Sequence, residues 1–459
     1  MHRVTLTVAA ALFMLLLDST ILNTSLPAIG ASFGVQPLTL SAAVTVYLLA
    51  GAAVLPLANW LGDRIGLRRL FVLSVAAFTA ASLLCGLAQD TTQLVLARAL
   101  QGAGGGLMLP VGRTLALRGA RKEDVIGITA LLTWPALFAP VLGPPLGGLI
   151  TTYASWRWNF LINLPVGLAA VLLIVRWVPA DTPQPRRPLD VPGAIGAAVG
   201  LMLLLGGLEW IGQVVEVPGA RAAALLTAAA GLAALAWTVH HLRRTPNPVL
   251  SLAPFAHRTF RVSTAAGGTF ALLCLQATPF LLPLLFQLAM GHDAVGAGAL
   301  LLPYFLGNLG MKSVTSPLLR RFGFRRVLVA SGAASAATIG AFALVRADAS
   351  WAQLVPMLLA AGCARSMLMT ALNTLTFADV PAAERGAASA LSTVSFQVAS
   401  ALGVAIGAIT LAVSQGPGAR LSVADFAWAF AVIGAICAAA TVAFWRLPAD
   451  AGAEVTGRA

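Results

Sequence analysis

Apolar residues fill long stretches of this chain, and short polar segments separate one stretch from the next. Each stretch is about 20 residues long, the length that an α-helix needs to cross the hydrocarbon core of a bilayer. Fourteen of them can be marked, centred near Leu17, Leu49, Val75, Leu100, Leu137, Leu168, Leu203, Gly231, Leu273, Leu302, Gly332, Ala361, Gly403 and Gly434. The pattern predicts an all-α integral membrane protein with fourteen transmembrane helices.

The composition agrees with a membrane protein and leaves little room for other parts. Hydrophobic residues make up 59% of the 459 residues and charged residues only 10%, whereas soluble proteins carry about 25% charged residues. Fourteen spans of about 20 residues leave about 180 residues for all loops and both tails. Because no extramembrane catalytic domain fits, we expect a protein that is not an enzyme. The apolar start imitates a signal peptide but continues to Pro27, so we expect a retained first helix.

The basic residues predict how the chain is oriented. The chain has 29 lysines and arginines and 16 acidic residues, which gives a net charge of +13. Most arginines flank helix ends on the same side as Met1, and the opposite side has Arg157, Arg221, Arg346 and Arg420. Because cationic residues accumulate in the cytoplasm, we expect a multi-pass protein of the cell (inner or cytoplasmic) membrane with both termini cytoplasmic. Its basic face would lie beside anionic lipid, and we expect no nucleic-acid partner.

Two loops repeat one pattern. Residues 61–70 and residues 318–327 each place a glycine two positions before an arginine pair, and the glycines, Gly66 and Gly323, are 257 positions apart. This offset fits two six-helix bundles, at 1–178 and 246–459, with two additional central helices at 179–245. Repeated halves with a site at their interface are the architecture of secondary transporters.

Several kinds of chemistry have no matching residues. A phosphate-binding loop needs Gly-Lys before Ser or Thr, and the two lysines, Lys122 and Lys312, do not follow glycine. The cysteines lie within spans without paired spacing, and the histidines lie at span ends or in loops. We therefore expect no nucleotide, no metal and no cofactor; the carboxylate described next makes H⁺ the expected coupling ion.

Two carboxylates lie within predicted spans, Asp18 and Glu209. Asp18 is about twelve residues into its helix, or about 18 Å, near the bilayer centre. An ionised carboxylate there costs several kcal/mol, so it should face a cavity, pair with a cation or hold a proton. Arg98 in the fourth predicted helix lies about 7.5 Å below the outer membrane surface and Asp18 about 12 Å below it, a difference that an extended arginine can span, so Arg98 is the candidate cation. Two alternatives remain: an inert, hydrogen-bonded Asp18, and an Arg98 that only extends to the interface.

Six segments resemble the motifs of a known family. Residues 17–27, 61–69, 98–104, 143–148, 156–167 and 189–193 are similar, in this order, to motifs of the major facilitator superfamily, specifically its fourteen-helix drug:proton antiporter branch. The second motif departs from the family pattern at Asn59, where glycine is usual, and at Leu67, where a basic residue is. The resemblance covers nearly the whole chain.

The resemblance implies roles for three groups of residues. It implies proton coupling by Asp18 and Arg98. It implies a gating loop, in which Asp63 latches the halves together near Gly386 in the outward-facing state; the loop residues are Asp63, Arg64, Gly66, Arg68 and Arg69. It implies an antiporter motif on a kinked fifth helix that seals the interface between the halves, formed by Gly143, Pro144, Pro145, Gly147 and Gly148.

The substrate is the least determined property. Polar and aromatic residues within spans form the candidate substrate cavity: Asn23, Tyr47, Gln101, Trp134, Gln276, Phe280, Gln287, Tyr304, Asn308, Arg365 and Asn373. Such a mixture suits small amphipathic molecules held by apolar walls and a few polar groups. Arg365 lies deep in its span without an intramembrane acid in the second half, so we expect it to favour anionic or neutral substrates.

These observations predict a monomeric, proton-coupled antiporter that exports amphipathic drugs or antibiotics by alternating access. One alternative is a narrow-specificity exporter of an endogenous metabolite or a self-made antibiotic, which would use the same machinery. A remote alternative is a non-transport membrane sensor or scaffold, but such a protein needs a signalling domain for which the short loops leave no room.

Overall fold

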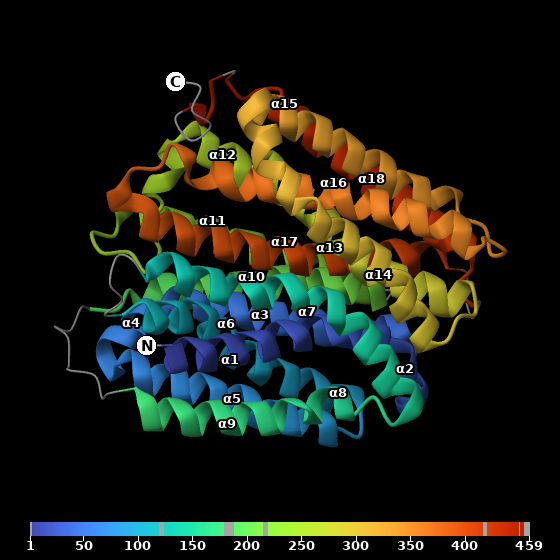
Figure 1. Cartoon of the computed structure of the whole chain (residues 1–459), viewed down its shortest axis with the longest axis horizontal. Helices are drawn as coiled ribbons and strands as arrows, with labels where there is room; N and C mark the ends of the chain where they lie inside the picture. The colour runs from blue at the N-terminus through green and yellow to red at the C-terminus, as the bar shows by residue number, and fades with distance from the viewer. Residues whose placement is uncertain are drawn as a thin grey trace.

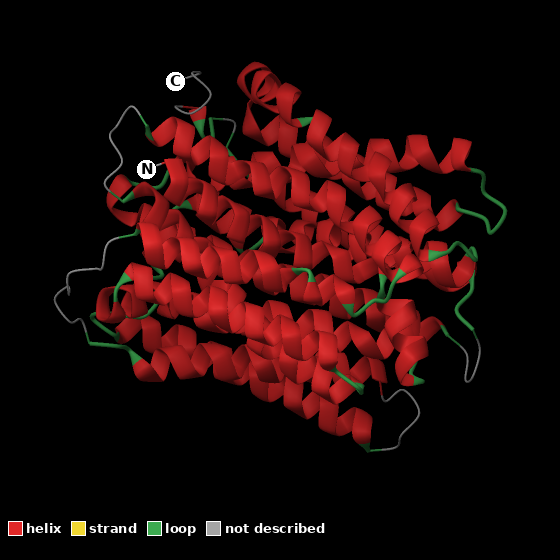
Figure 2. Cartoon of the chain, turned by 60° about the horizontal axis from the view of Figure 1, so that its bottom comes forward, coloured by secondary structure: helices red, strands yellow, loops and turns green. Residues whose placement is uncertain are grey.

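A computed structural model of the chain describes residues 2–118, 124–178, 188–213, 219–415, 420–448 and 450–453. The regular secondary structure in these ranges is entirely helical (Figure 2). The predicted fold class, an all-α membrane protein, is confirmed.

The helices fall into three groups along the chain (Figure 1). The first group comprises α1 (His2–Ile21), η1 (Leu22–Thr24), α2 (Leu26–Phe33), α3 (Ser41–Val54), α4 (Ala58–Ile65), α5 (Leu67–Leu87), α6 (Thr91–Leu117), α7 (Val125–Tyr153), α8 (Trp158–Leu161) and α9 (Asn163–Trp177). The second comprises α10 (Val191–Gln213) and α11 (Ala220–Arg244). The third comprises η4 (Ala253–Ala256), α12 (Arg258–Thr264), α13 (Gly267–Leu284), α14 (Ala294–Gly310), α15 (Lys312–Ala341), α16 (Trp351–Ala378), α17 (Arg385–Ser414) and α18 (Val423–Phe444).

Thirteen helical segments of the described chain are long and apolar enough to cross a membrane, and α14 is a shorter apolar helix. This result is compatible with the fourteen predicted spans. The difference arises in the α14–α15 region, where Gly323 interrupts α15 with φ 76° and ψ 165°. The first part of α15 extends the path of α14, so Lys312 is separated from the Gly323 turn by about 16 Å of helix.

The repeated loops have the same backbone geometry. Gly66 ends α4 and precedes α5 with φ 88° and ψ 146°, close to the values at Gly323. Residues other than glycine rarely adopt a positive φ, because their Cβ atom then comes too close to the neighbouring backbone. Both turns therefore require glycine. The sequence repeat therefore corresponds to a repeated turn in the fold.

The two halves share an extensive core at one end of the molecule. One cluster of buried side chains combines Leu22 and Leu26 from the first half with Phe280, Leu281 and Leu300 from the second. Two other clusters stay within one half each: one draws on α1, α5, α6 and α9, and the other on α13, α15, α16 and α18. We call the end with α2 and α8 the joined end, and the end with α4, α12 and both termini the separated end (Figure 1).

The two additional helices pack chiefly on each other, and α10 also contacts both halves. Leu201 and Leu205 of α10 are buried against Leu49 of α3 and Ala401 of α17. The Glu209 carboxylate, 9% exposed, accepts hydrogen bonds from Ser41 and, at 3.2 Å, from Thr45 Oγ1. Glu209 therefore lies in the packed interface between α10 and α3. Residues 179–187, at the start of the predicted central segment 179–245, lie outside the described residues.

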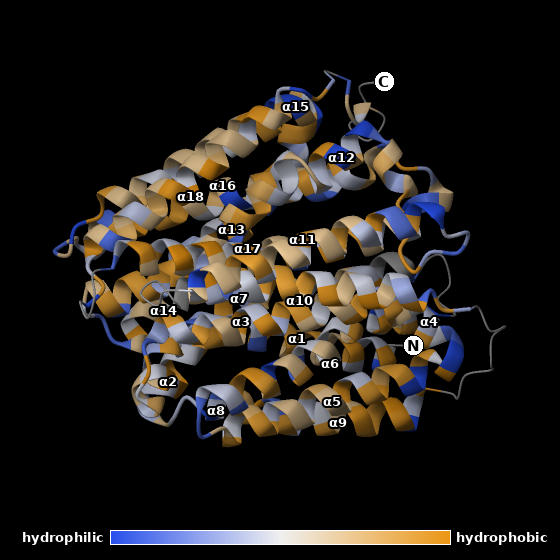
Figure 3. Cartoon of the chain, turned by 180° about the vertical axis from the view of Figure 1, so that it is seen from behind, coloured by the Kyte–Doolittle hydropathy of each residue, from blue (hydrophilic) through white to orange (hydrophobic). Residues whose placement is uncertain are grey.

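The outer surface of α11 is strongly apolar. Leu226 is 71% exposed, and Leu232 and Trp237 are more than half exposed. Figure 3 shows apolar residues along the outward faces of the helices, with hydrophilic residues gathered at the two ends. This distribution is what a bilayer around the bundle requires.

Candidate functional site

A buried ion pair joins the first and fourth spans. Arg98 Nη1 on α6 donates to Asp18 Oδ2 on α1 over 2.7 Å, and the exposed fraction of both side chains is 1% or less. The same guanidinium donates to Gln101 Oε1 over 2.6 Å, and its carbon lies 4.0 Å from the centroid of the Tyr47 ring. We expected Asp18 to face a cavity, to pair with a cation or to hold a proton; in the structure it pairs with a cation.

Neutral donors complete the hydrogen bonding of the Asp18 carboxylate. Gln101 Nε2 and Asn163 Nδ2 each donate to Asp18 Oδ1 over 2.8 Å. Both amides also approach Ser82 Oγ, at 2.7 and 3.3 Å, and all of these side chains are at most 1% exposed. A buried ion pair is tolerated when further hydrogen bonds satisfy its charges, as they do here.

Members of this network differ in how far the sequence predicts them. Asn163, at the start of α9, lies within the 156–167 motif but was not singled out as a site residue. Ser82 has no sequence signal, because a lone serine in an apolar helix is common packing material. Gln101, which was expected to line the substrate cavity, instead lies fully buried within the network.

Asp18 has no exposed surface in this conformation. Its network is built from α1, α3, α5, α6 and α9 of the first half, and Asp18 lies about one turn before η1, where the joined end closes. A route for a proton from water to this carboxylate therefore requires a change of conformation.

Polar contacts cross between the halves at the joined end. Asn23 Nδ2 donates to the Pro279 carbonyl oxygen over 3.4 Å, and Gln287 Nε2 donates to the Thr24 carbonyl oxygen over 3.0 Å. Phe280, which the sequence placed in the substrate cavity, is 1% exposed within the shared core. These three predicted cavity residues hold the joined end closed.

The predicted antiporter motif, on α7, lies against α1 and α14 at the joined end. A Cβ added to Gly143 would lie 2.1 Å from Thr20 Oγ1 of α1, so only glycine fits there. A Cβ at Gly148 would lie 2.2 Å from the Ala294 carbonyl oxygen of α14, and Gly298 of α14 packs equally closely on Pro144. The motif therefore allows α7 to approach α1 of its own half and α14 of the other half without intervening side chains. Gly147 packs in the same way on Ile21 and Thr24, and Pro145 on Gly298.

The predicted gating loop surrounds the Gly66 turn at the separated end. The Arg64 guanidinium carbon lies 5.3 Å from the Trp60 ring, and Arg68 Nη2 donates to the Val175 carbonyl oxygen over 2.5 Å. Arg69 is exposed and Asp63 half-buried. Among the described residues Asp63 forms no hydrogen bond or ion pair, so the expected latch to the start of α17 is not made in this conformation.

The second half contains a related but unpaired arginine. Arg365 on α16 is 8% exposed, and it donates to the Leu275 carbonyl oxygen over 3.2 Å and to Gln276 Oε1 over 2.5 Å. Its guanidinium carbon lies 5.9 Å from the Tyr304 ring, as that of Arg98 lies over Tyr47. Within the described chain it has no carboxylate partner, and Lys312 is close enough to repel it electrostatically.

The remaining predicted cavity residues are dispersed. Trp134 is 55% exposed and stacks on Phe138, with ring centroids 4.9 Å apart. The Asn308 carbonyl oxygen accepts a hydrogen bond from Ser366 Oγ over 2.6 Å, near Arg365. Asn373 is exposed. The structure thus places Gln276 and Tyr304 beside Arg365, whereas Trp134 lies elsewhere.

Comparison with known proteins identifies the family. The family model of the Major Facilitator Superfamily matches residues 8–404 and residues 265–458. The chain belongs to this superfamily. It is 35% identical to "Putative multidrug resistance protein MdtD" of Klebsiella pneumoniae over 98% of its own length and 96% of that protein. It is also 35% identical to the protein of the same name in Pectobacterium atrosepticum, covering 96% and 95% of the two chains.

Solved structures of superfamily transporters share the fold. The D-xylose-proton symporter superposes with a TM-score of 0.70 at 14% identity, covering 98% of this chain and 99% of that one. The nucleoside transporter NupG superposes with a TM-score of 0.68 at 12% identity, covering 97% and 100%. At these identities the likeness concerns the fold alone. The protein is a multi-pass membrane transporter of the superfamily.

Proposed function

We propose that this protein exports amphipathic molecules across the cytoplasmic membrane in exchange for protons, with both termini in the cytoplasm. The observation that carries the proposal is the Asp18–Arg98 pair, buried beside the joined end. The similarity to proteins named for multidrug resistance supports drug export, and the contacts of the 143–148 segment across the halves support a seal between them.

The position of Asp18 suggests how proton uptake follows the motion of the halves. On the orientation expected from the arginines, the joined end is extracellular, and this conformation faces inward. Asn23 and Thr24, which contact the second half, follow Asp18 by one to two helical turns. Opening the joined end breaks these contacts and lets water reach Asp18. Protonation then removes the charge that attracts Arg98, and the rearranged first half returns inward to release the proton.

The Asp63 loop supplies the opposite closure in this scheme. Asp63 lacks a hydrogen-bond partner among the described residues in the inward-facing form, and it lies at the separated end with α4. When the separated end closes, its carboxylate meets the positive amino-terminal end of α17. Each end of the molecule thus has its own set of contacts between the halves, and the two sets alternate.

The driving force is sufficient for useful export. Moving one elementary charge through about 100 mV releases about 2.3 kcal/mol. Because about 1.4 kcal/mol corresponds to a tenfold ratio, one proton sustains a roughly fiftyfold gradient of a neutral substrate.

The test is uphill export by everted membrane vesicles that carry either the natural protein or Asp18→Asn. Ethidium is the probe, and a pH gradient is the driving force. We expect Asp18→Asn to abolish gradient-driven accumulation. Asp348→Asn is the matched control, because Asp348 makes only a surface pair with Arg346 and its side chain is 77% exposed. Undiminished uphill transport by Asp18→Asn would exclude Asp18 as the coupling residue.

Arg365 is the proposed determinant of substrate charge. A guanidinium without a carboxylate partner, beside Lys312, disfavours multivalent cations and favours anionic or neutral molecules. Export of an anionic dye and of ethidium is compared in Arg365→Ala. We expect anionic export to fall more than cationic export, and equal, unchanged export of both would contradict the role.

A further inference from the structure

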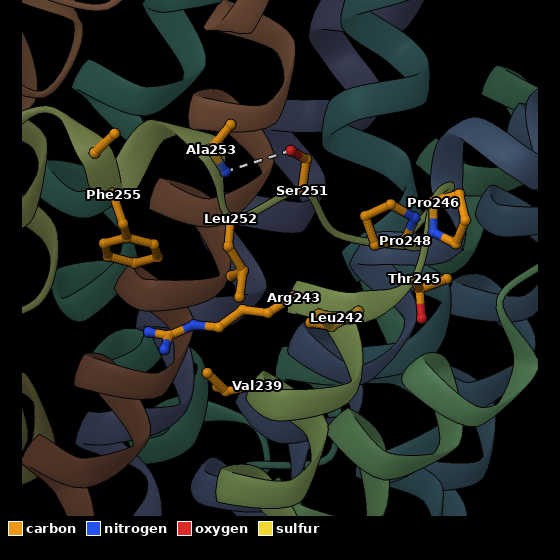
Figure 4. Close-up of a pocket in the computed structure, with 11 residues that line it drawn as sticks. Val239, Leu242, Arg243, Thr245, Pro246, Pro248, Ser251, Leu252, Ala253 and Phe255 are labelled. Atoms are coloured by element: carbon orange, nitrogen blue, oxygen red, sulfur yellow. Dashed lines mark hydrogen bonds between the residues drawn. The ribbon is translucent and has the colours of Figure 1, made fainter.

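A pocket lies at the separated end, outside the interface between the halves (Figure 4). It has a volume of about 730 Å³, within the range of about 300–1,000 Å³ that small-molecule sites occupy. Its walls come from the last turns of α11, the segment that follows α11 and η4. Nothing in the transport scheme uses this pocket.

The lining combines one positive charge with apolar walls. Val239, Leu242, Leu252 and Phe255 supply apolar surface, and Arg243 is the charged residue among the described residues that line the pocket. Figure 4 shows the Arg243 side chain stretched across the pocket beneath Leu252. A ligand for this lining needs both a negative group and hydrocarbon.

The polar atoms in the pocket are available to a ligand. Within the described chain the Arg243 guanidinium has no hydrogen-bond or ion-pair partner, although five N–H groups can donate. Ser251 Oγ accepts a hydrogen bond from the Ala253 backbone N–H over 3.4 Å, which leaves its own O–H free to donate. Guanidinium and hydroxyl donors together suit the oxygens of a phosphate.

The surroundings hold the pocket in shape. Asp190, which precedes α10, accepts hydrogen bonds from the Val249 backbone N–H over 3.2 Å and from His241 Nε2 over 2.8 Å. Thr245 Oγ1 lies 3.1 Å from the same imidazole nitrogen. The segment after α11 is therefore tied to both additional helices, and the pocket is preformed.

The location points to a lipid rather than to a soluble ligand. α11 has the least buried of the described spans, and Val239 and Trp237 of its last turns are 40% and 51% exposed on the lipid-facing side. The pocket therefore lies where the hydrocarbon of the bilayer meets the basic end of the molecule. Basic pockets at this level bind the headgroups of anionic phospholipids.

We propose that this pocket binds one anionic phospholipid. Arg243 and Ser251 contact the phosphate, and the apolar walls formed by Val239, Leu242 and Phe255 contact the glycerol and the first acyl carbons. On the orientation proposed above, the lipid belongs to the cytoplasmic leaflet. The site would attach the additional helix pair to the membrane, independently of the substrate and proton sites.

The test is lipid retention by the purified, delipidated full-length protein in neutral detergent. The protein is titrated with phosphatidylglycerol and, separately, with phosphatidylcholine of the same acyl chains, and bound lipid is counted by native mass spectrometry. We expect one tightly retained phosphatidylglycerol and weaker phosphatidylcholine. Arg243→Gln should weaken retention about tenfold, the effect of losing one charge-assisted hydrogen bond.

Two further variants separate the pocket from general charge and from misfolding. Arg244→Gln removes the same charge from the neighbouring exposed position, which does not line the pocket, and should change retention less than about twofold. Ala256→Trp fills the pocket while keeping Arg243 and should abolish retention. Equal losses in Arg243→Gln and Arg244→Gln, an unaffected Ala256→Trp, equal retention of phosphatidylcholine, or displacement by free glycerol phosphate would each overturn the proposal.

Discussion

The Asp18–Arg98 pair predicts that its two charges depend on each other for the stability of the fold, because both side chains are at most 1% exposed and each is the ionic partner of the other. Removing one member of a buried pair costs about 3–5 kcal/mol, and removing both costs little when neutral groups replace them. The three variants needed are Asp18→Asn, Arg98→Gln and the double substitution.

The contacts that each variant keeps determine how much free energy of unfolding it is expected to lose. In Asp18→Asn, the Arg98 guanidinium retains Gln101 Oε1 at 2.6 Å and the Tyr47 ring at 4.0 Å. In Arg98→Gln, Asp18 retains donors from Gln101 and Asn163, each at 2.8 Å. We expect each single variant to lose about 3 kcal/mol near neutral pH, at the low end of the range for broken buried pairs, and the double variant to lose less than either.

Each single variant leaves one charge buried without its partner, and the double variant leaves neither. A thiol-reactive fluorophore measures thermal unfolding, because Cys85, Cys274 and Cys437 are buried until the fold opens. A double variant less stable than both singles would refute this account of the pair.

Three further predictions concern other parts of the fold. Gly148→Ala should remove most transport, because its Cβ would lie 2.2 Å from the Ala294 carbonyl oxygen and force α7 from α14, whereas Gly127→Ala in the same helix meets nothing within 4 Å and should transport normally. Gly323→Ala should lower stability by about 1–3 kcal/mol, because alanine is strained at φ 76°, while Gly340→Ala in α15 should be neutral or stabilising; equal effects would contradict this. Asp190→Asn should lower stability by about 1–2 kcal/mol near neutral pH, with the difference fading below about pH 4. Burial acts to raise the pKa of Asp190, but hydrogen bonds from His241, Gly193 and Val249 outweigh it and lower that pKa. The stabilisation by the carboxylate is therefore complete above the pKa of the unfolded state and is lost as the pH falls through the lower pKa of the folded state. Thermal unfolding of the natural protein and of Asp190→Asn across pH tests this prediction, and a stability difference between the two that persists in acid would contradict it.

Much of the architecture follows from local sequence features. A bilayer offers no partners for backbone N–H and C=O groups, so each long apolar stretch has to form a helix. The paired glycine–arginine loops predicted two related halves, and both glycines adopt the positive φ that such turns require. Asp18 and Arg98 could also be identified from the sequence, because a charged side chain inside a membrane is costly and is retained mainly where it has a function.

The tertiary structure decided which predicted residues meet. Gln101 joined the ion pair instead of a substrate cavity, and Asn163 and Ser82, which no charge or motif role had distinguished, completed the carboxylate's hydrogen bonds. Depth in a span follows from residue counting, but the direction of a side chain depends on how five helices rotate and pack against one another. Which end is closed depends likewise on contacts between distant segments, such as Gly148 with Ala294, that no local pattern specifies.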